Sequence, residues 1–276
     1  MRRKLFCEYG PFAYWISTQK CRLQRHFKNF ISSRKIARHK EMNPLPVLVA
    51  EYATILFRDS VLFDPLMEQN KLENVMLAFP KVSHVVIKPG ETFSFWALVG
   101  KCTKRKGYKT ARMLRYQKPT RDIGGGLCQI TNLLHFLALH SMLTITERYE
   151  HDYVDLYPDF GTQIPFGTGT AILYNYRDLR FKNNTDLTYQ IIFYIKDNHF
   201  HGELRSDRPQ KNTYRIESSD CYFSREKDGV YRNGKAIRHL IDKNTGDIIS
   251  SEEIASYHAK VIYDTSNLEI KSCIEE

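Results

Sequence analysis

The chain has 276 residues, of which 42% are hydrophobic and 13% aromatic, so it can bury a large core and is neither a disordered nor a fibrous protein. Its six cysteines lack CxxC pairs and finger-like spacing, which argues against a zinc site and a disulfide framework and favours thiols in a reducing compartment. No apolar run approaches the ~18 residues that cross a bilayer, and the N-terminus is too interrupted for a secretory signal. The sequence therefore predicts a cytoplasmic protein without a cofactor or a metal.

The net charge of +10 lies in the first forty residues. They hold eleven of the 41 Lys and Arg residues but one of the 31 acidic residues, Glu8, so the rest of the chain is balanced. Residues 16–38 follow a helical period, with apolar side chains on one face: Ile16, Leu23, Phe27, Phe30 and Ile31. Two alternatives stay open, a helix packed on its own domain with a solvated basic face and a helix at the inner face of an anionic membrane, reached through residues 1–40. The spacing of the aromatic residues does not favour nucleic acid.

Turn-forming residues divide the next part of the chain. Pro44 and Pro46 end the first helix, and Asp64-Pro65 begins a second helix that Pro80 ends. Strands are expected at 85–87 and 92–95, joined as a hairpin across Lys88-Pro89-Gly90-Glu91, and another strand at 113–116.

A triple glycine, Gly124-Gly125-Gly126, precedes a cysteine that opens an apolar run of helical period. The spacing predicts a central helix from Cys128 to about Ser141. Strands are then expected at 144–148, 153–157, 170–176, 179–182, 188–195 and 201–205. The tail adds hairpin signals at Asp228-Gly229, Asn233-Gly234 and Thr245-Gly246.

These patterns predict an α+β protein in which the central helix packs on an antiparallel sheet. We divide it into a basic helical region at 1–80, a core domain at 81–210 and a β-rich extension at 211–276.

Several motifs in this order resemble the VanW family, which is named for an accessory protein in some bacterial glycopeptide-resistance gene clusters. The motifs are Pro89-Gly90-Glu91-Thr92-Phe93-Ser94-Phe95, Val99-Gly100, Lys106-Gly107-Tyr108, Gly124-Gly125-Gly126-Leu127-Cys128, His151, and Asp178-Leu179-Arg180-Phe181-Lys182-Asn183-Asn184-Thr185. They cover residues 80–205, and the resemblance implies a role at the cell envelope and vancomycin resistance. One departure is that Gly169 stands where many members have aspartate.

A helix N-terminus lowers the pKa of a thiol, so Cys128 is a candidate nucleophile. Gly124, Gly125, Gly126 and Gln129 are candidates for an oxyanion hole. His151, at the position of the family's histidine, is the candidate base, whereas His135 lies two helical turns from Cys128.

For a third catalytic residue Asp152, Asp155 and Asp159 are all available, and Asp159 is preferred. The order of cysteine helix and histidine strand is similar to that of papain-like and transglutaminase-like enzymes.

Glu91, Arg148 and Arg180 are candidates for substrate binding, although a turn or ion pairs would explain them equally well. Two functions remain open. In the first, Cys128 and His151 catalyse acyl transfer or amide hydrolysis on a cell-wall-related, peptide-like substrate. In the second, the glycine loop is a non-catalytic pocket of an accessory protein for an anionic ligand or a membrane-associated partner.

Overall fold

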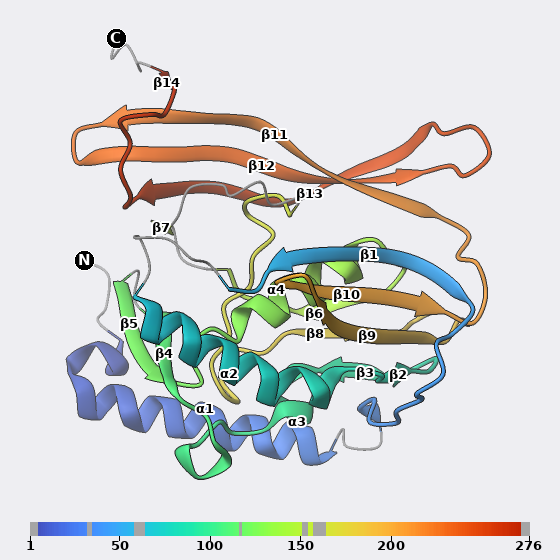
Figure 1. Ribbon diagram of the computed structural model, residues 1–276, viewed down its shortest axis with the longest axis horizontal. Coiled ribbons are helices and arrows are strands. Elements are labelled where there is room, and N and C mark those ends of the chain that lie inside the picture. The colour runs from blue at the N-terminus through green and yellow to red at the C-terminus, as the bar shows by residue number, and fades with distance from the viewer. Residues whose placement is uncertain are drawn as a thin grey trace.

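The computed structural model describes residues 5–31, 35–57, 64–115, 118–150, 154–156 and 164–271. It confirms an α+β architecture in which sheets predominate (Figure 1). The helices in these ranges are η1 (Phe6–Tyr9), α1 (Pro11–Ile31), α2 (Pro65–Val82), α3 (Phe95–Val99), η3 (Lys104–Lys106) and α4 (Cys128–Leu139).

The strands of the described residues form four sheets. An antiparallel sheet has the order β1-β10-β9-β2, from β1 (Val47–Ile55), β10 (His199–Ser206), β9 (Tyr189–Lys196) and β2 (Val86–Ile87). A larger sheet has the order β14-β11-β12-β13-β7, from β14 (Ile270–Lys271), β11 (Thr213–Glu226), β12 (Gly229–Ile241), β13 (Ile248–Val261) and β7 (Val154–Asp155). The smaller sheets are β3-β8-β6, from β3 (Thr92–Ser94), β8 (Arg180–Lys182) and β6 (Thr144–Glu147), and β4-β5, from β4 (Thr110–Arg115) and β5 (Lys118–Ile123).

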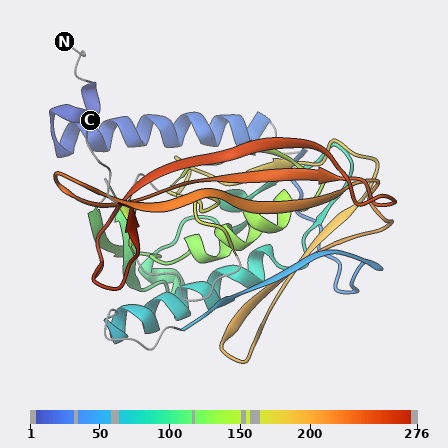
Figure 2. The same cartoon turned by 90° about the horizontal axis from the view of Figure 1, so that it is seen from above.

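Helix α4 lies in the middle of the molecule, between the long β11-β12-β13 ribbons and α2 (Figures 1 and 2). Nine of its twelve residues are buried, as expected of a helix that is apolar on all sides. It packs on β1 and β10 of the antiparallel sheet. The approach is close at Gly202, where an added Cβ would come within 2.9 Å of Leu137 and 3.0 Å of Leu133.

Helix α2 begins as its sequence predicts. The Asp64 side chain accepts hydrogen bonds from the amides of Leu66 (3.0 Å) and Met67 (3.4 Å), and Pro65 occupies the first turn. The helix continues past Pro80 to Val82, because a proline two residues from the end interrupts little of the helix.

Several local predictions are wrong or incomplete. Strand β1 was not expected, and α1 ends at Ile31 instead of continuing to Arg38. The turn at 88–91 forms, but β2 pairs with β9 and β3 with β8, so the two strands are not a hairpin. Residues 170–176 are not a strand, because residues 170–172 are irregular and residues 174–176 form a turn, with Asn175 at φ 49°.

A further error is at Asn233-Gly234, which lies inside the continuous strand β12. The irregularity of pairing falls on the opposite strand, between Ser219 and Tyr222 of β11. The other two tail turns join β11 to β12 and β12 to β13 as expected. No helix in the described ranges is long and apolar enough to cross a membrane.

Candidate functional site

The glycine loop before Cys128 is held tightly against β4 and α2. A Cβ on Gly125 would lie 2.3 Å from the carbonyl oxygen of Ala111, so only glycine fits there. The buried Asn74 of α2 donates to the carbonyl oxygens of Gly125 (2.9 Å) and Lys109 (3.0 Å). These contacts hold the loop that leads into α4, whose first residue is Cys128.

The backbone amides of the loop differ in what they bind. Those of Gly124, Gly125 and Gln129 donate to the carbonyl oxygens of Lys109 (2.9 Å), Asp122 (3.2 Å) and Gly126 (3.2 Å). Among the described residues, the amides of Gly126 and Leu127 have no hydrogen-bond acceptor. An amide without an acceptor in a buried segment is the donor available to a ligand.

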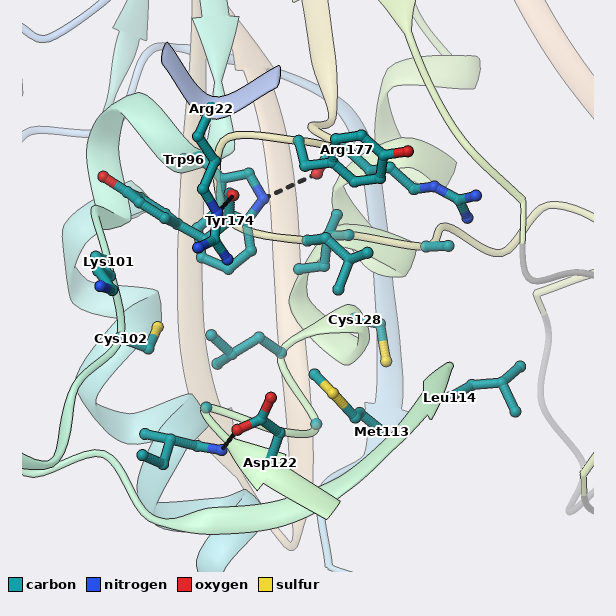
Figure 3. A pocket seen from close by; sticks show the side chains of 18 of the residues that line it. Arg22, Trp96, Lys101, Cys102, Met113, Leu114, Asp122, Cys128, Tyr174 and Arg177 are labelled. Carbon is teal, nitrogen blue, oxygen red and sulfur yellow. Dashed lines mark hydrogen bonds between the residues drawn. The ribbon is translucent and has the colours of Figure 1, made fainter. Parts of the chain in front are cut away.

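Cys128 faces a cavity of about 320 Å³ (Figure 3). Its walls come from α1, the segment after α3, β4 and β5, the start of α4 and residues 171–177. The lining includes four aromatic side chains, Tyr14, Trp96, Tyr174 and Tyr176. It also includes three cations and two acids, Arg22, Lys101, Arg177, Asp122 and Glu150. The cavity therefore combines apolar surface with charges of both signs.

The aromatic wall is held by hydrogen bonds to the backbone of 171–177. The Trp96 indole N–H donates to the Arg177 carbonyl oxygen (2.9 Å), and its ring meets that of Tyr174 edge to face, with centroids 5.6 Å apart. The Arg22 Nε donates to the Tyr174 carbonyl oxygen (3.3 Å). Figure 3 shows these residues on the same side of the cavity.

The start of α3 is fixed by a buried carboxylate. Asp178 accepts hydrogen bonds from Ser94 Oγ (2.6 Å) and the Trp96 amide (3.0 Å) and pairs with Arg180 (2.8 Å). Burial raises the pKa of Asp178, although Arg180 opposes this. Asp178 thus positions Trp96 in the cavity wall.

Two cysteines line the cavity in different surroundings. Burial raises the pKa of Cys102, on the segment after α3, to about 11. Cys128 is half-buried at the positive end of the α4 macrodipole. Figure 3 shows the two thiols on different walls.

The partners predicted for Cys128 lie largely outside the described residues. His151, Asp152 and Asp159 belong to segments that the structure does not describe. Asp155 is described, is buried in β7, and accepts a hydrogen bond from the Tyr263 hydroxyl (3.0 Å).

The two histidines of α4 and its end have structural roles. His135 Nδ1 donates to the Thr168 carbonyl oxygen (2.7 Å), and burial, with a smaller effect of Arg148, lowers its pKa to about 3. His140 contacts the Phe136 carbonyl oxygen (2.9 Å) and the Tyr52 hydroxyl (3.0 Å). Both are therefore occupied away from the cavity.

Two further predicted site residues, Glu91 and Gln129, contact protein groups and do not line the cavity. Glu91 accepts from the Lys88 amide (2.8 Å) within its turn, and the Gln129 side chain donates to Thr54 (3.0 Å) and Ile55 (2.8 Å) of β1.

The two arginines proposed for substrate binding are also engaged. Arg148 donates to the carbonyl oxygens of Gly167, Gly169 (3.1 Å) and Ile254 (3.3 Å). Arg180 binds Asp178 and lies 3.7 Å from Glu147. Of the predicted residues, Gly124, Gly126 and Cys128 come together at the cavity.

Sequence reasoning missed the aromatic and cationic wall. Trp96 directly follows the motif that ends at Phe95, and this position was the only sequence feature that could have indicated its place in the site. Arg22 and Tyr174 carried no such signal, since they are 152 residues apart. No group of three or more metal-binding side chains occurs among the residues with described positions.

The fold and site together define an α+β protein with a cysteine at the start of a buried helix, facing a cavity of mixed polarity. Residues 70–205 match the family model described as VanW like protein. The chain is 34% identical over 219 residues to the Vancomycin B-type resistance protein VanW of Enterococcus faecalis, covering 79% of each chain. It is 29% identical over 147 residues to the uncharacterized protein YoaR of Bacillus subtilis, covering 52% of this chain and 46% of that protein. No solved structure matches it. The chain belongs to the VanW family, as its motifs predicted.

Proposed function

We propose that this VanW-family chain is a thiol enzyme that catalyses acyl transfer or amide hydrolysis, with Cys128 as its nucleophile. The observation that carries the proposal is that Cys128 opens the buried helix α4 and lines a cavity large enough for part of a peptide. The relative in Enterococcus faecalis is named as a vancomycin resistance protein, which favours a cell-wall-related substrate at the cell envelope.

The surroundings of Cys128 suit a thiolate and a developing oxyanion. The positive end of α4 favours negative charge on the sulfur, and the amides of Gly126 and Leu127 can donate to an oxygen beside it. In the proposed reaction, the thiolate attacks an acyl carbon, a C–S bond forms, and the amide C–N bond breaks as the leaving amine takes a proton. Water or an amine then releases the acyl group.

His151 is the proposed proton carrier, with Asp159 as the preferred orienting residue. The proposal follows the order along the chain, a cysteine at a helix start and then a histidine, which is similar to that of papain-like and transglutaminase-like enzymes. In this scheme His151 holds the proton of Cys128 and later donates it to the leaving amine.

The cavity lining favours a peptide-like ligand that carries both charges. Arg22 and Lys101 supply cations for a carboxylate, and Asp122 supplies an acid for an ammonium group. Glu150 adds a second acid, although it also pairs with Arg148 (3.1 Å). We propose a cytoplasmic chain, for which the cell-wall-related substrates within reach are precursors.

Alkylation of the two cavity cysteines tests the nucleophile directly. The protein is treated with iodoacetamide over a range of pH, and modification of Cys128 and Cys102 is followed by peptide mass spectrometry. Cys102 is the matched control, because a pKa of about 11 leaves about one thiol in a thousand ionised at pH 8. We expect Cys128 to react at least about tenfold faster, with an apparent pKa below the ordinary ~8.5.

A His151→Ala variant tests whether His151 acts on Cys128. Loss of the histidine should raise the apparent pKa of Cys128 and leave the reaction of Cys102 unchanged. If Cys128 reacts as slowly as Cys102, or is indifferent to His151, the thiol enzyme is ruled out. A cavity that binds a ligand equally well in the Cys128→Ser variant would then indicate the non-catalytic accessory function.

A further inference from the structure

Helix α1 packs on the body of the protein through its polar side chains. Arg25 makes two hydrogen bonds of 2.5 Å to the Glu147 carboxylate of β6, and Asn29 accepts a hydrogen bond from Arg180. The Asn175 amide lies 3.0 Å from His26 Nε2. With Arg22 on the Tyr174 carbonyl, the inner face of α1 is held by charged and polar contacts.

The apolar face of α1 points to solvent. Five large side chains on this face are between 57% and 78% exposed: Phe12, Trp15, Leu23, Phe27 and Phe30. They recur at the spacing of one helical face, and η1 adds exposed apolar side chains before them, Leu5, Phe6 and Tyr9. Single exposed apolar residues are ordinary, but a continuous row of this length marks a binding surface.

The shape and charge of this helix indicate what covers the row. Helix α1 lies along one edge of the molecule in both views (Figures 1 and 2). It contains four Lys or Arg residues and no Asp or Glu, and Lys20 and Lys28 are exposed. An aromatic row with cations and no acids is typical of a helix that lies in the interface of an anionic bilayer.

A second copy of the chain fits this surface less well. A two-fold contact through the same face would bring the lysines of both copies together without an acid on α1 to balance them. An anionic phospholipid surface offers the opposite charge along the whole helix.

We propose that α1 is an interfacial anchor, which binds anionic phospholipid bilayers through Phe12, Trp15, Leu23, Phe27 and Phe30. The anchor does not depend on the thiol chemistry proposed for Cys128. The two features are nevertheless adjacent, because Tyr14 and Arg22 of α1 line the cavity. An anchored α1 therefore holds the cavity beside the membrane surface.

Vesicle sedimentation with the full chain tests the anchor. Vesicles of phosphatidylglycerol and phosphatidylcholine in equal parts are compared with vesicles of phosphatidylcholine alone. We expect the wild-type protein to sediment with the anionic vesicles, less so at high salt, and to sediment far less with the neutral ones. Bromine-labelled lipid should quench the exposed Trp15 more than the buried Trp96.

The test variant is Phe27→Ser with Phe30→Ser, which removes two rings from the outer face. It should bind at least about tenfold more weakly, since each buried aromatic side chain contributes substantially to partitioning. The matched control is Leu66→Ser with Met76→Ser, two exposed apolar residues of α2. Figure 2 shows α2 along the edge opposite α1, so the control should bind like wild type.

Three results would overturn the anchor. The first is equal binding by the wild type and the variant with Phe27→Ser and Phe30→Ser, and the second is no binding by the wild type. The third is a wild-type dimer in sedimentation velocity that the variant converts to a monomer while neither binds vesicles, which would assign the face to a second copy. The alkylation of Cys128 is measured without vesicles, so failure of the anchor leaves that test intact.

Discussion

Helices α1 and α4 use apolar side chains in opposite ways. Helix α4 buries Leu133, Leu134 and Leu137 in the core, whereas α1 turns Leu23 and its phenylalanines outward and meets the body through Arg25. Both helices show helical periodicity in the sequence. Periodicity in a sequence therefore shows that a helix has an apolar and a polar face, but it does not show which face contacts the protein. A charged face can pack on the protein where acidic side chains and carbonyl oxygens are available to bind it.

The largest difference in the free energy of unfolding is expected between leucine-to-alanine substitutions in the two helices. Leu134→Ala in α4 should lower the free energy of unfolding by about 2–5 kcal/mol, because it leaves a cavity in the core. Leu23→Ala in α1 should change it by less than about 0.5 kcal/mol, since that side chain already meets solvent. Urea unfolding followed by circular dichroism measures both.

The outcome for Leu23 also sharpens the comparison. A loss for Leu23→Ala as large as that for Leu134→Ala would mean that the outer face of α1 is covered in solution. Dependence of that loss on protein concentration would then identify a second copy as the cover.

A smaller effect is expected from the polar contacts of α1. Arg25→Ala should weaken attachment of the helix by about 1.5–3 kcal/mol, because it removes a charge-assisted pair that is largely shielded from water. The change should appear as faster hydrogen exchange in α1, with exchange in α4 unchanged. Lys28→Ala, at an exposed position of the same helix, is the control and should leave exchange as in wild type. Equal effects of the two variants would show that Arg25 does not hold α1.

The sequence anticipated the parts of the fold that depend on local signals. The start of α4 follows from Gly125 and Cys128, and the start of α2 follows from the Asp64-Pro65 cap. Most strands after α4 also follow from alternation and turn residues. These features depend on neighbouring residues alone, so a single sequence contains them.

Features that depend on distant contacts escaped prediction. Residues 170–176 look like a strand, but Asn132 of α4 accepts hydrogen bonds from the Thr170 amide (2.8 Å) and hydroxyl (2.9 Å), so the start of this segment is bound to a helix and not to a neighbouring strand. The wall of the candidate site has the same origin, because Arg22 and Trp96 reach the backbone of residues 174–177 from far away in the sequence. Of this site, only the glycine loop and Cys128 could be predicted from the sequence, because they are adjacent in it.

The last prediction concerns a polar group that α4 buries completely, in contrast to the open face of α1. His135 has a pKa of about 3 in the folded protein because burial disfavours its charged form, whereas the unfolded chain takes up a proton near pH 6.5. The folded state therefore binds fewer protons between these values, and stability must fall as the pH is lowered through that window. The slope contributed by His135 is about 1.4 kcal/mol per pH unit. His135→Asn, which can still donate to Thr168 but does not titrate, should unfold in urea with a pH dependence shallower by about this amount. Equal slopes for variant and wild type between pH 6.5 and 4.5 would mean that His135 gains its proton without unfolding and that the surroundings of His135 are open to water.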